Sequence, residues 1–167
     1  MLDLTFSEEQ EMLRDTVRSL LAEHAPLTVA REMEDDPVGY PDELWKRMAE
    51  LDLLGLLLPE EHGGSGMTAL EGVVLYEELG RSLAPTPHFV SCVASGLAVA
   101  RGGDAEQRSR WLPRIATGEA VLTPAWLEPD RGFGPEGVQT RATSDDGETY
   151  VVTGVKRHVL FAAAATR

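Results

Sequence analysis

The sequence predicts an α+β fold, in which an amino-terminal α-helical bundle is followed by an incomplete β-domain. Apolar residues recur at helical spacing as far as residue 118, whereas short segments typical of strands follow residue 119. Asp and Gly turns separate those later segments. We therefore expect two domains, a helical domain over residues 1–118 and the start of a β-domain over residues 119–167.

Three helix starts carry the capping-box pattern, in which a capping side chain and a residue three positions later each satisfy a free backbone N–H. The pairs are Ser7 with Gln10, Thr68 with Glu71, and Asp104 with Gln107. Apolar residues at helical spacing follow each pair. This combination predicts helices over residues 7–24, 68–80 and 104–118.

Two further helices and a loop are predicted between these segments. Proline and acidic residues at 41–43 favour a helix start, and the apolar pattern continues to about Leu53. Residues 88–99 are mostly small and apolar, so we expect that helix to be buried on most sides. Residues 63–66, GGSG, permit backbone angles that other residues avoid. They predict a loop rather than a phosphate cradle, because no strand precedes them.

The expected strands are residues 120–123, 137–142, 149–153 and 156–161. So few short strands leave unpaired edges, which a closed or doubly packed sheet would cover. We therefore expect the chain to end inside its β-domain.

Composition and charge exclude several classes of protein. The 43% hydrophobic content is typical of a globular protein, and the net charge of −13 disfavours nucleic acid and membrane surfaces as partners. No apolar run approaches the roughly 20 residues of a membrane span. The first residues lack a secretory signal, and Cys92 has no second cysteine to pair with, so we expect a cytoplasmic protein.

Several titratable residues have a structural interpretation that is favoured over a catalytic one. The acidic cluster at residues 32–36 is interpreted as a solvated helix end rather than a metal site. His62 and His88 lack the spacing of metal ligands and are interpreted as surface residues in loops. Cys92 is interpreted as a core residue.

Two acidic positions are likewise not expected to be catalytic. Glu77 and Glu78 are adjacent and point to different sides of one helix, which disfavours a shared catalytic pair. Glu128 is expected to fix a turn rather than act as a base, and Lys156 to lie on the surface of a hairpin.

Five sequence blocks occur in a fixed order along the chain. They are residues 58–66 (LPEEHGGSG), 76–81 (YEELGR), 105–119 (AEQRSRWLPRIATGE), 127–129 (LEP) and 150–156 (YVVTGVK). In the same order, these blocks resemble the patterns lPeeyGGxG, eElgr, seeqkxryLPxlaxGe, TEP and yxlnGxK of the acyl-CoA dehydrogenase family. One such block would be weak evidence, whereas all of them in order indicate the family.

The resemblance implies a three-part enzyme of helical bundle, β-barrel and second helical bundle, with FAD between the barrel and the last bundle. The implied reaction oxidises an acyl-CoA thioester to the α,β-enoyl-CoA, in lipid or steroid side-chain catabolism. A carboxylate base removes the α-proton while the flavin accepts the β-hydrogen as hydride. In the family the last bundle supplies that base, and no residue here matches it. The resemblance therefore implies no catalytic residue in this chain and no turnover by the chain alone.

The resemblance also implies that FAD-contacting residues lie in the β-segment, at Trp126, Leu127, His158, Val159 and Leu160. Leu127 aligns with a flavin-facing threonine of the family, and residues 158–160 align with its W-I-T segment. Two hydroxyl groups are thus replaced by leucine. Each lost hydrogen bond would cost on the order of 1 kcal/mol and weaken flavin binding by up to about an order of magnitude, or other groups would support the flavin instead. Trp126 either packs over the flavin edge or fills the barrel core.

Three hypotheses stay open. The first is a FAD-dependent dehydrogenase with an unusual flavin pocket, and the second is a non-catalytic partner subunit of a heteromeric acyl-CoA dehydrogenase. The third is a free-standing helical binding module of residues 1–118. The resemblance implies an acyl-CoA substrate, an electron-transfer flavoprotein or similar acceptor, and a homo- or hetero-oligomer.

Overall fold

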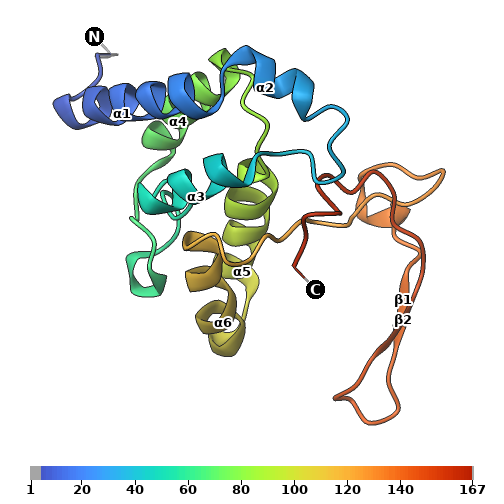
Figure 1. Ribbon diagram of the computed structural model, residues 1–167. Coiled ribbons are helices and arrows are strands. Elements are labelled where there is room, and N and C mark those ends of the chain that lie inside the picture. Colours follow the sequence, from blue (N-terminus) through green and yellow to red (C-terminus); the bar gives the residue numbers. More distant parts are fainter. Residues whose placement is uncertain (1–4, 167) are drawn as a thin grey trace.

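The computed structural model describes residues 5–166, which are mainly helical and carry a short two-stranded ribbon (Figure 1). The α-helices are α1 (Glu8–His24), α2 (Leu27–Glu32), α3 (Asp42–Glu50), α4 (Ala69–Arg81), α5 (Gly96–Gly102) and α6 (Ala105–Ala116). The remaining elements are a π-helical segment (Phe89–Ser95), two 3₁₀ turns (Glu60–His62 and Pro135–Gly137), and the strands β1 (Arg141–Thr143) and β2 (Val151–Thr153). The predicted α+β fold, helices followed by a small open sheet, is confirmed.

All three predicted capping boxes are present. Ser7 begins α1, Thr68 begins α4 and Asp104 begins α6, each with the reciprocal bond from the residue three positions later. In the first box, the Gln10 backbone N–H donates to Ser7 Oγ at 3.2 Å, and the Ser7 N–H donates to Gln10 Oε1 at 3.1 Å. Local sequence therefore specifies where these helices begin.

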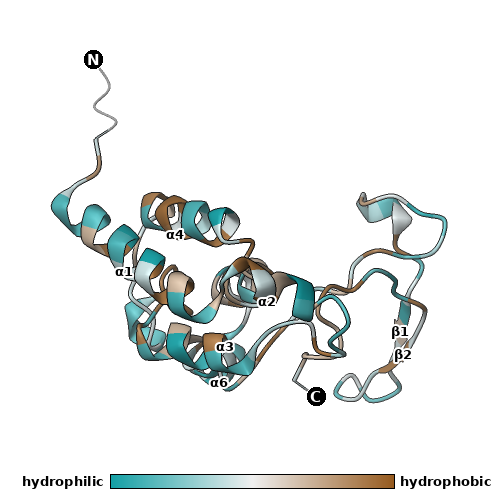
Figure 2. Cartoon of the chain, turned by 45° about the horizontal axis from the view of Figure 1, so that its top comes forward, coloured by the Kyte–Doolittle hydropathy of each residue, from teal (hydrophilic) through white to brown (hydrophobic). Residues whose placement is uncertain are grey.

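Helices α1 and α4 pack side by side and are joined by polar contacts (Figures 1 and 2). The Arg18 guanidinium donates two hydrogen bonds to the Glu78 carboxylate, from Nη2 to Oε1 at 2.6 Å and from Nε to Oε2 at 3.0 Å. At the other end, Gln10 Nε2 donates to Glu71 Oε1 at 2.8 Å. That bond, followed by the one from Thr68, lowers the pKa of Glu71 to about 2. The two helix starts are thereby tied to each other.

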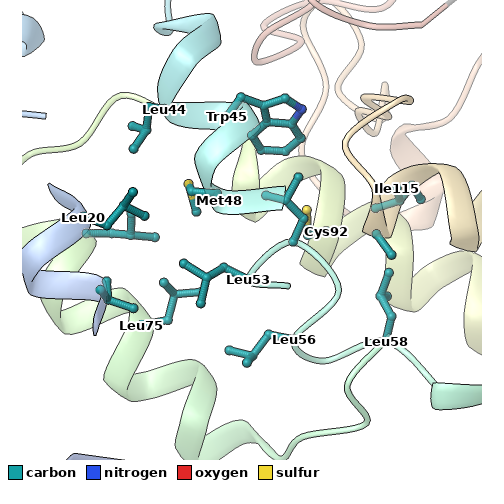
Figure 3. Packing of buried hydrophobic residues seen from close by; sticks show 14 of the residues in the cluster. Leu20, Leu44, Trp45, Met48, Leu53, Leu56, Leu58, Leu75, Cys92 and Ile115 are labelled. Atoms are coloured by element: carbon teal, nitrogen blue, oxygen red, sulfur yellow. The ribbon is translucent and has the colours of Figure 1, made fainter. Parts of the chain in front are cut away.

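The core lies between the helices and the connection that follows α3 (Figure 3). Residues 53–58 insert a run of leucines among the helices, and all except the partly buried Leu57 are buried. Met48 of α3, Leu75 of α4 and Ile115 of α6 are each fully buried against this cluster. Burying a side chain of this size contributes about 2 kcal/mol. The helical part therefore has a continuous apolar core.

After residue 119, the structure agrees with the sequence prediction at two of the four expected strands, 137–142 and 149–153, which overlap β1 and β2. Among the described residues only β1 and β2 form strands, paired antiparallel with Ala142 opposite Val152. Residues 120–123 form no strand, because Leu122 N–H donates to Ser91 Oγ at 3.1 Å and Val121 N–H donates to Thr166 Oγ1 at 2.9 Å. These backbone groups are satisfied by the helical part and the tail instead of a neighbouring strand.

Residues 156–161 also form no strand, contrary to expectation. His158 and Phe161 have positive φ angles of 53° and 52°, which interrupt an extended ladder. The chain then turns back toward the helices (Figure 1), where the Thr166 N–H donates to the Val121 carbonyl at 2.9 Å. The β1–β2 ribbon itself projects away from the helices, with every residue of both strands exposed (Figures 1 and 2). The division at residue 118 stays a prediction.

Within residues 5–166, no helix combines the length and apolar character needed to cross a bilayer.

Candidate functional site

Three of the five predicted FAD contacts line a common pocket. Trp126, His158 and Leu160 line a cavity of about 80 Å³ together with residues of the π-helical segment. The lining is completed by Phe89, Val90, Ala94, Thr123 and Pro124. Leu127 and Val159 are not part of this lining. That these residues bind FAD stays a prediction.

The pocket is apolar and open on one side. Trp126 is 64% exposed and Leu160 is 63% exposed, and the Trp126 ring meets Phe133 edge to face at 6.4 Å between centroids. An aromatic and aliphatic wall of this kind fits one face of a planar ring. The Trp126 and His158 ring nitrogens are polar groups of the lining that suit ring heteroatoms, whereas the Thr123 hydroxyl donates to the Leu160 carbonyl. The cavity is too small to enclose a flavin. The residues therefore fit FAD as one wall of its site.

Two hydrogen bonds join the two chain segments that form this wall, residues 123–128 and 156–160. The Arg157 N–H donates to the Leu127 carbonyl at 2.8 Å, and Thr123 Oγ1 donates to the Leu160 carbonyl at 2.7 Å. Residues 123–128 and 156–160 therefore run next to each other without forming a regular ladder.

Glu128 lies beneath this wall and is only 4% exposed. Its carboxylate accepts from the backbone N–H groups of Gln139 at 2.7 Å and Thr140 at 3.0 Å, from Thr140 Oγ1 at 2.7 Å and from Lys156 Nζ at 2.6 Å. Lys156, and then Thr140, lower the pKa of Glu128 to about 2. Both expected positions are corrected. Glu128 joins its own segment to residues 139–140 and to Lys156 rather than fixing a local turn, and the side chain of Lys156 is only 25% exposed rather than free on a hairpin surface.

His88 corrects another expectation, because it is 1% exposed rather than a surface residue. Its Nε2 donates to the Leu53 carbonyl at 3.0 Å, since a carbonyl can only accept, and its Nδ1 accepts from the Tyr76 hydroxyl at 2.6 Å. Burial lowers the pKa of His88 to about 4. Spacing along the chain gave no sign that Leu53 and Tyr76 would meet this ring. The imidazole anchors the start of the π-helical segment.

The π-helical segment supplies the pocket residues that sequence reasoning missed. Phe89 is 58% exposed, whereas Val90, Ser91 and Cys92 are buried, so the expected burial holds for only part of this helix. Cys92 is confirmed as a core residue, and burial raises the pKa of its thiol. The signal available in the sequence was the break at the preceding prolines, which places an aromatic residue at a helix start.

The Gly-rich segment at 63–66 is confirmed as a tight loop. The backbone N–H groups of Gly64, Ser65 and Gly66 donate to carbonyls of residues 55–59 at 2.9–3.1 Å. A Cβ at Gly64 would lie 2.2 Å from the Leu58 carbonyl oxygen. Because these amides are already used within the loop, they are not available as a phosphate cradle.

The other titratable groups are placed as follows. Glu77 is exposed while Glu78 is buried, as expected for neighbours on different sides of a helix. His62 is partly exposed beside Glu61, and the acidic cluster at 32–36 follows the end of α2. In the part of the chain that the structure describes, no three His, Cys, Asp or Glu side chains are arranged to hold a metal ion.

Comparison with known proteins agrees with this architecture. Residues 7–119 match the family model described as acyl-CoA dehydrogenase, N-terminal domain. The chain is 36% identical over 159 residues to the (2S)-methylsuccinyl-CoA dehydrogenase of Cereibacter sphaeroides, a match that covers 93% of this chain and 28% of that protein.

Two solved structures share the fold. An acyl-CoA dehydrogenase from Bacillus anthracis complexed with FAD superposes with a TM-score of 0.87 at 28% identity, covering 99% of this chain and 29% of that one. The ChsE4-ChsE5 complex from Mycobacterium tuberculosis superposes with a TM-score of 0.83 at 28% identity, covering 98% of this chain and 43% of that one. The chain thus spans well under half the length of these relatives. From the family match and the shared fold, we conclude that this chain belongs to the acyl-CoA dehydrogenase family.

Proposed function

We propose that the chain is part of a FAD-dependent acyl-CoA dehydrogenase that oxidises acyl-CoA thioesters to α,β-enoyl-CoA, in lipid or steroid side-chain catabolism. The observation that carries the proposal is the convergence of Trp126, His158 and Leu160 on one apolar pocket beside the π-helical segment. The FAD complex of the Bacillus anthracis relative supports the choice of cofactor. A cytoplasmic oligomer that passes electrons to an electron-transfer flavoprotein or similar acceptor is part of the same proposal.

Each residue of the pocket has a defined part in this proposal. FAD, when bound, supplies a hydride acceptor. The Trp126 indole and the His158 imidazole would contact FAD from this wall, and Phe89 and Val90 of the same lining would help to exclude water. The carboxylate base lies outside this chain. We therefore expect no turnover from the 167 residues alone.

The test has two parts. The coding region beyond Arg167 is sequenced, and the complete product is purified and its visible absorbance recorded. The proposal expects a second helical half with a glutamate base and the absorbance bands of bound flavin. A complete product that stays colourless after incubation with FAD would refute it. A steady acyl-CoA-dependent rate from the 167-residue chain would refute the placement of the base.

A non-catalytic partner subunit is the second candidate. Leu127 and Leu160 favour it, because neither side chain offers a hydroxyl group to a flavin. The ChsE4-ChsE5 complex supports it as well, since that relative is an assembly of two named components. This candidate expects a colourless chain that co-purifies with a flavin-containing second chain.

A further inference from the structure

Glu128 and Lys156 form a partly buried ion pair that joins the two segments of the pocket wall but does not line the pocket. Neither residue lines the cavity that Trp126, His158 and Leu160 share. The side chain of Glu128 is 5% exposed and that of Lys156 is 25% exposed, with 2.6 Å between Nζ and Oε1. The pair therefore serves some purpose other than direct contact with a ligand in that pocket.

Each member of the pair is two residues from a pocket residue. Glu128 follows Trp126, and Lys156 precedes His158. Lys156 Nζ also donates to the Trp126 carbonyl at 3.3 Å, so one ammonium group contacts both the backbone of Trp126 and the carboxylate of Glu128. A change in the position of the Lys156 ammonium group would therefore break or displace its hydrogen bond to the Trp126 carbonyl.

Only a few other hydrogen bonds described for this region join residues 123–128 to residues 156–160. The Arg157 N–H to Leu127 carbonyl bond and the Thr123 to Leu160 bond are the others described above. His158 has a positive φ angle of 53°, so regular strand pairing does not extend through it. The relative position of the two segments consequently depends strongly on the charged pair.

We infer that Glu128 and Lys156 are positioning residues, which hold Trp126 and His158 together in the pocket wall. The inference rests on the proposed function for its consequence, because a displaced wall would bind FAD more weakly. The Glu128 carboxylate also accepts hydrogen bonds from the backbone of Gln139 and Thr140, which precede β1. One carboxylate therefore contacts both the pocket wall and the segment that leads into the ribbon. Once its cation is removed, the buried carboxylate has no charged partner and the wall must rearrange to hydrate it.

The first measurement uses the chain without any cofactor. The chain contains three tryptophans, so its indole N–H groups give three signals in a ¹⁵N-¹H spectrum, and Trp126→Phe identifies the relevant one. Lys156→Met and Glu128→Gln are expected to shift the Trp126 signal while leaving those of Trp45 and Trp111 unchanged. Lys156→Arg, which keeps the charge, is expected to return the Trp126 signal toward its position in the unmodified chain.

Two comparisons make this measurement decisive. The matched control is Lys46→Met, which breaks an exposed pair with Asp42 on α3 and is expected to leave the Trp126 signal in place. The Trp126 signal staying unmoved in both Lys156→Met and Glu128→Gln would overturn the inference. A shift of all three indole signals would also overturn it, because the pair would then support the whole fold rather than the wall.

The second measurement uses the complete FAD-loaded protein. Lys156→Met is expected to raise the Kd for FAD roughly tenfold and to change the visible circular dichroism of the flavin. A shifted Trp126 signal with unchanged FAD affinity would overturn the functional consequence of the pair. If the unmodified complete protein binds no FAD, the proposed function fails, and the first measurement still decides whether the pair positions the wall.

Discussion

His88 couples the stability of the helical part to pH through a single buried side chain. Its folded-state pKa is about 4, against about 6.5 for an exposed histidine. Between these values the unfolded chain binds a proton that the folded chain does not, so the free energy of unfolding falls as pH drops from 6.5 to 4. The expected loss is on the order of 3 kcal/mol.

Urea denaturation at several pH values checks this prediction. His88→Asn is expected to be less stable than the unmodified chain at pH 7, because the Tyr76 and Leu53 partners lose their imidazole, but to show a flatter dependence between pH 6.5 and 4. His62→Asn, at a partly exposed position, serves as the control and should keep the original slope. An unchanged slope in His88→Asn would contradict the assignment.

Leu160 offers a residue-level test of the proposed flavin wall. Leu160→Thr restores a hydroxyl group at the position that the family resemblance assigns to a flavin hydrogen bond, and Leu160 lines the pocket. We expect the Kd for FAD of the complete protein to fall roughly fivefold, the effect of about 1 kcal/mol. Val159→Thr adds a hydroxyl at the neighbouring position, which does not line the pocket, and should change the Kd little. Equal effects of the two variants would argue against a specific contact at residue 160.

Helices α1 and α4 depend on a charged contact whose two partners differ in exposure. The side chain of Glu78 is 5% exposed, whereas that of Arg18 is 43% exposed. Arg18→Met leaves the carboxylate buried without its bidentate partner, so we expect a clear decrease in Tm. Arg47→Met removes exposed pairs with Glu43 and Glu50 on α3 and should lower the Tm much less.

Replacing both partners distinguishes the loss of the ion pair from the loss of packing. Arg18→Met combined with Glu78→Met removes the buried charge together with its partner, and is expected to recover part of the Tm lost in the single variant. Thermal unfolding followed by circular dichroism gives the Tm of the unmodified chain, Arg18→Met, Arg47→Met and the double variant. A double variant no more stable than Arg18→Met would show that the buried carboxylate is not the source of the loss.

Across the whole molecule, stability is concentrated in the helical part. The β1–β2 ribbon has a ladder of three residue pairs, with every strand residue exposed, whereas Met48, Leu75 and Leu112 are fully buried. We expect amide hydrogens of the ribbon to exchange close to the unfolded rate, and those of α4 and α6 to exchange most slowly. Hydrogen exchange followed by mass spectrometry tests this, and ribbon protection comparable with that of α4 would contradict it.

The agreement between sequence and structure follows the range of the interactions involved. Ser7, Thr68 and Asp104 each marked a helix start correctly, because a capping box needs partners only three residues apart. His88 was misplaced, because its partners Tyr76 and Leu53 lie 12 and 35 positions away. Trp126, His158 and Leu160 were named from the family resemblance, and periodicity gave no sign that they share a pocket.

Two of the four predicted strands overlap β1 and β2, and the other two failed for a related reason. Residues 120–123 and 156–161 have the composition of strands, yet a strand forms only where another extended segment completes its ladder. In the described residues the backbone of 121–122 is satisfied by Ser91 and Thr166 instead. The composition of a segment indicates a preference for extended backbone, but a sheet forms only where a neighbouring extended segment is available to pair with it.

Local patterns in the amino acids were therefore enough to establish the helical half, its capped starts and the family, since each depends on neighbours along the chain or on ordered motifs. Folding in three dimensions was needed to bury His88, to join Glu128 to Lys156 and to bring the π-helical segment against Trp126 and His158. Those contacts depend on distances through space between segments far apart in the chain, and no spacing within one segment encodes them.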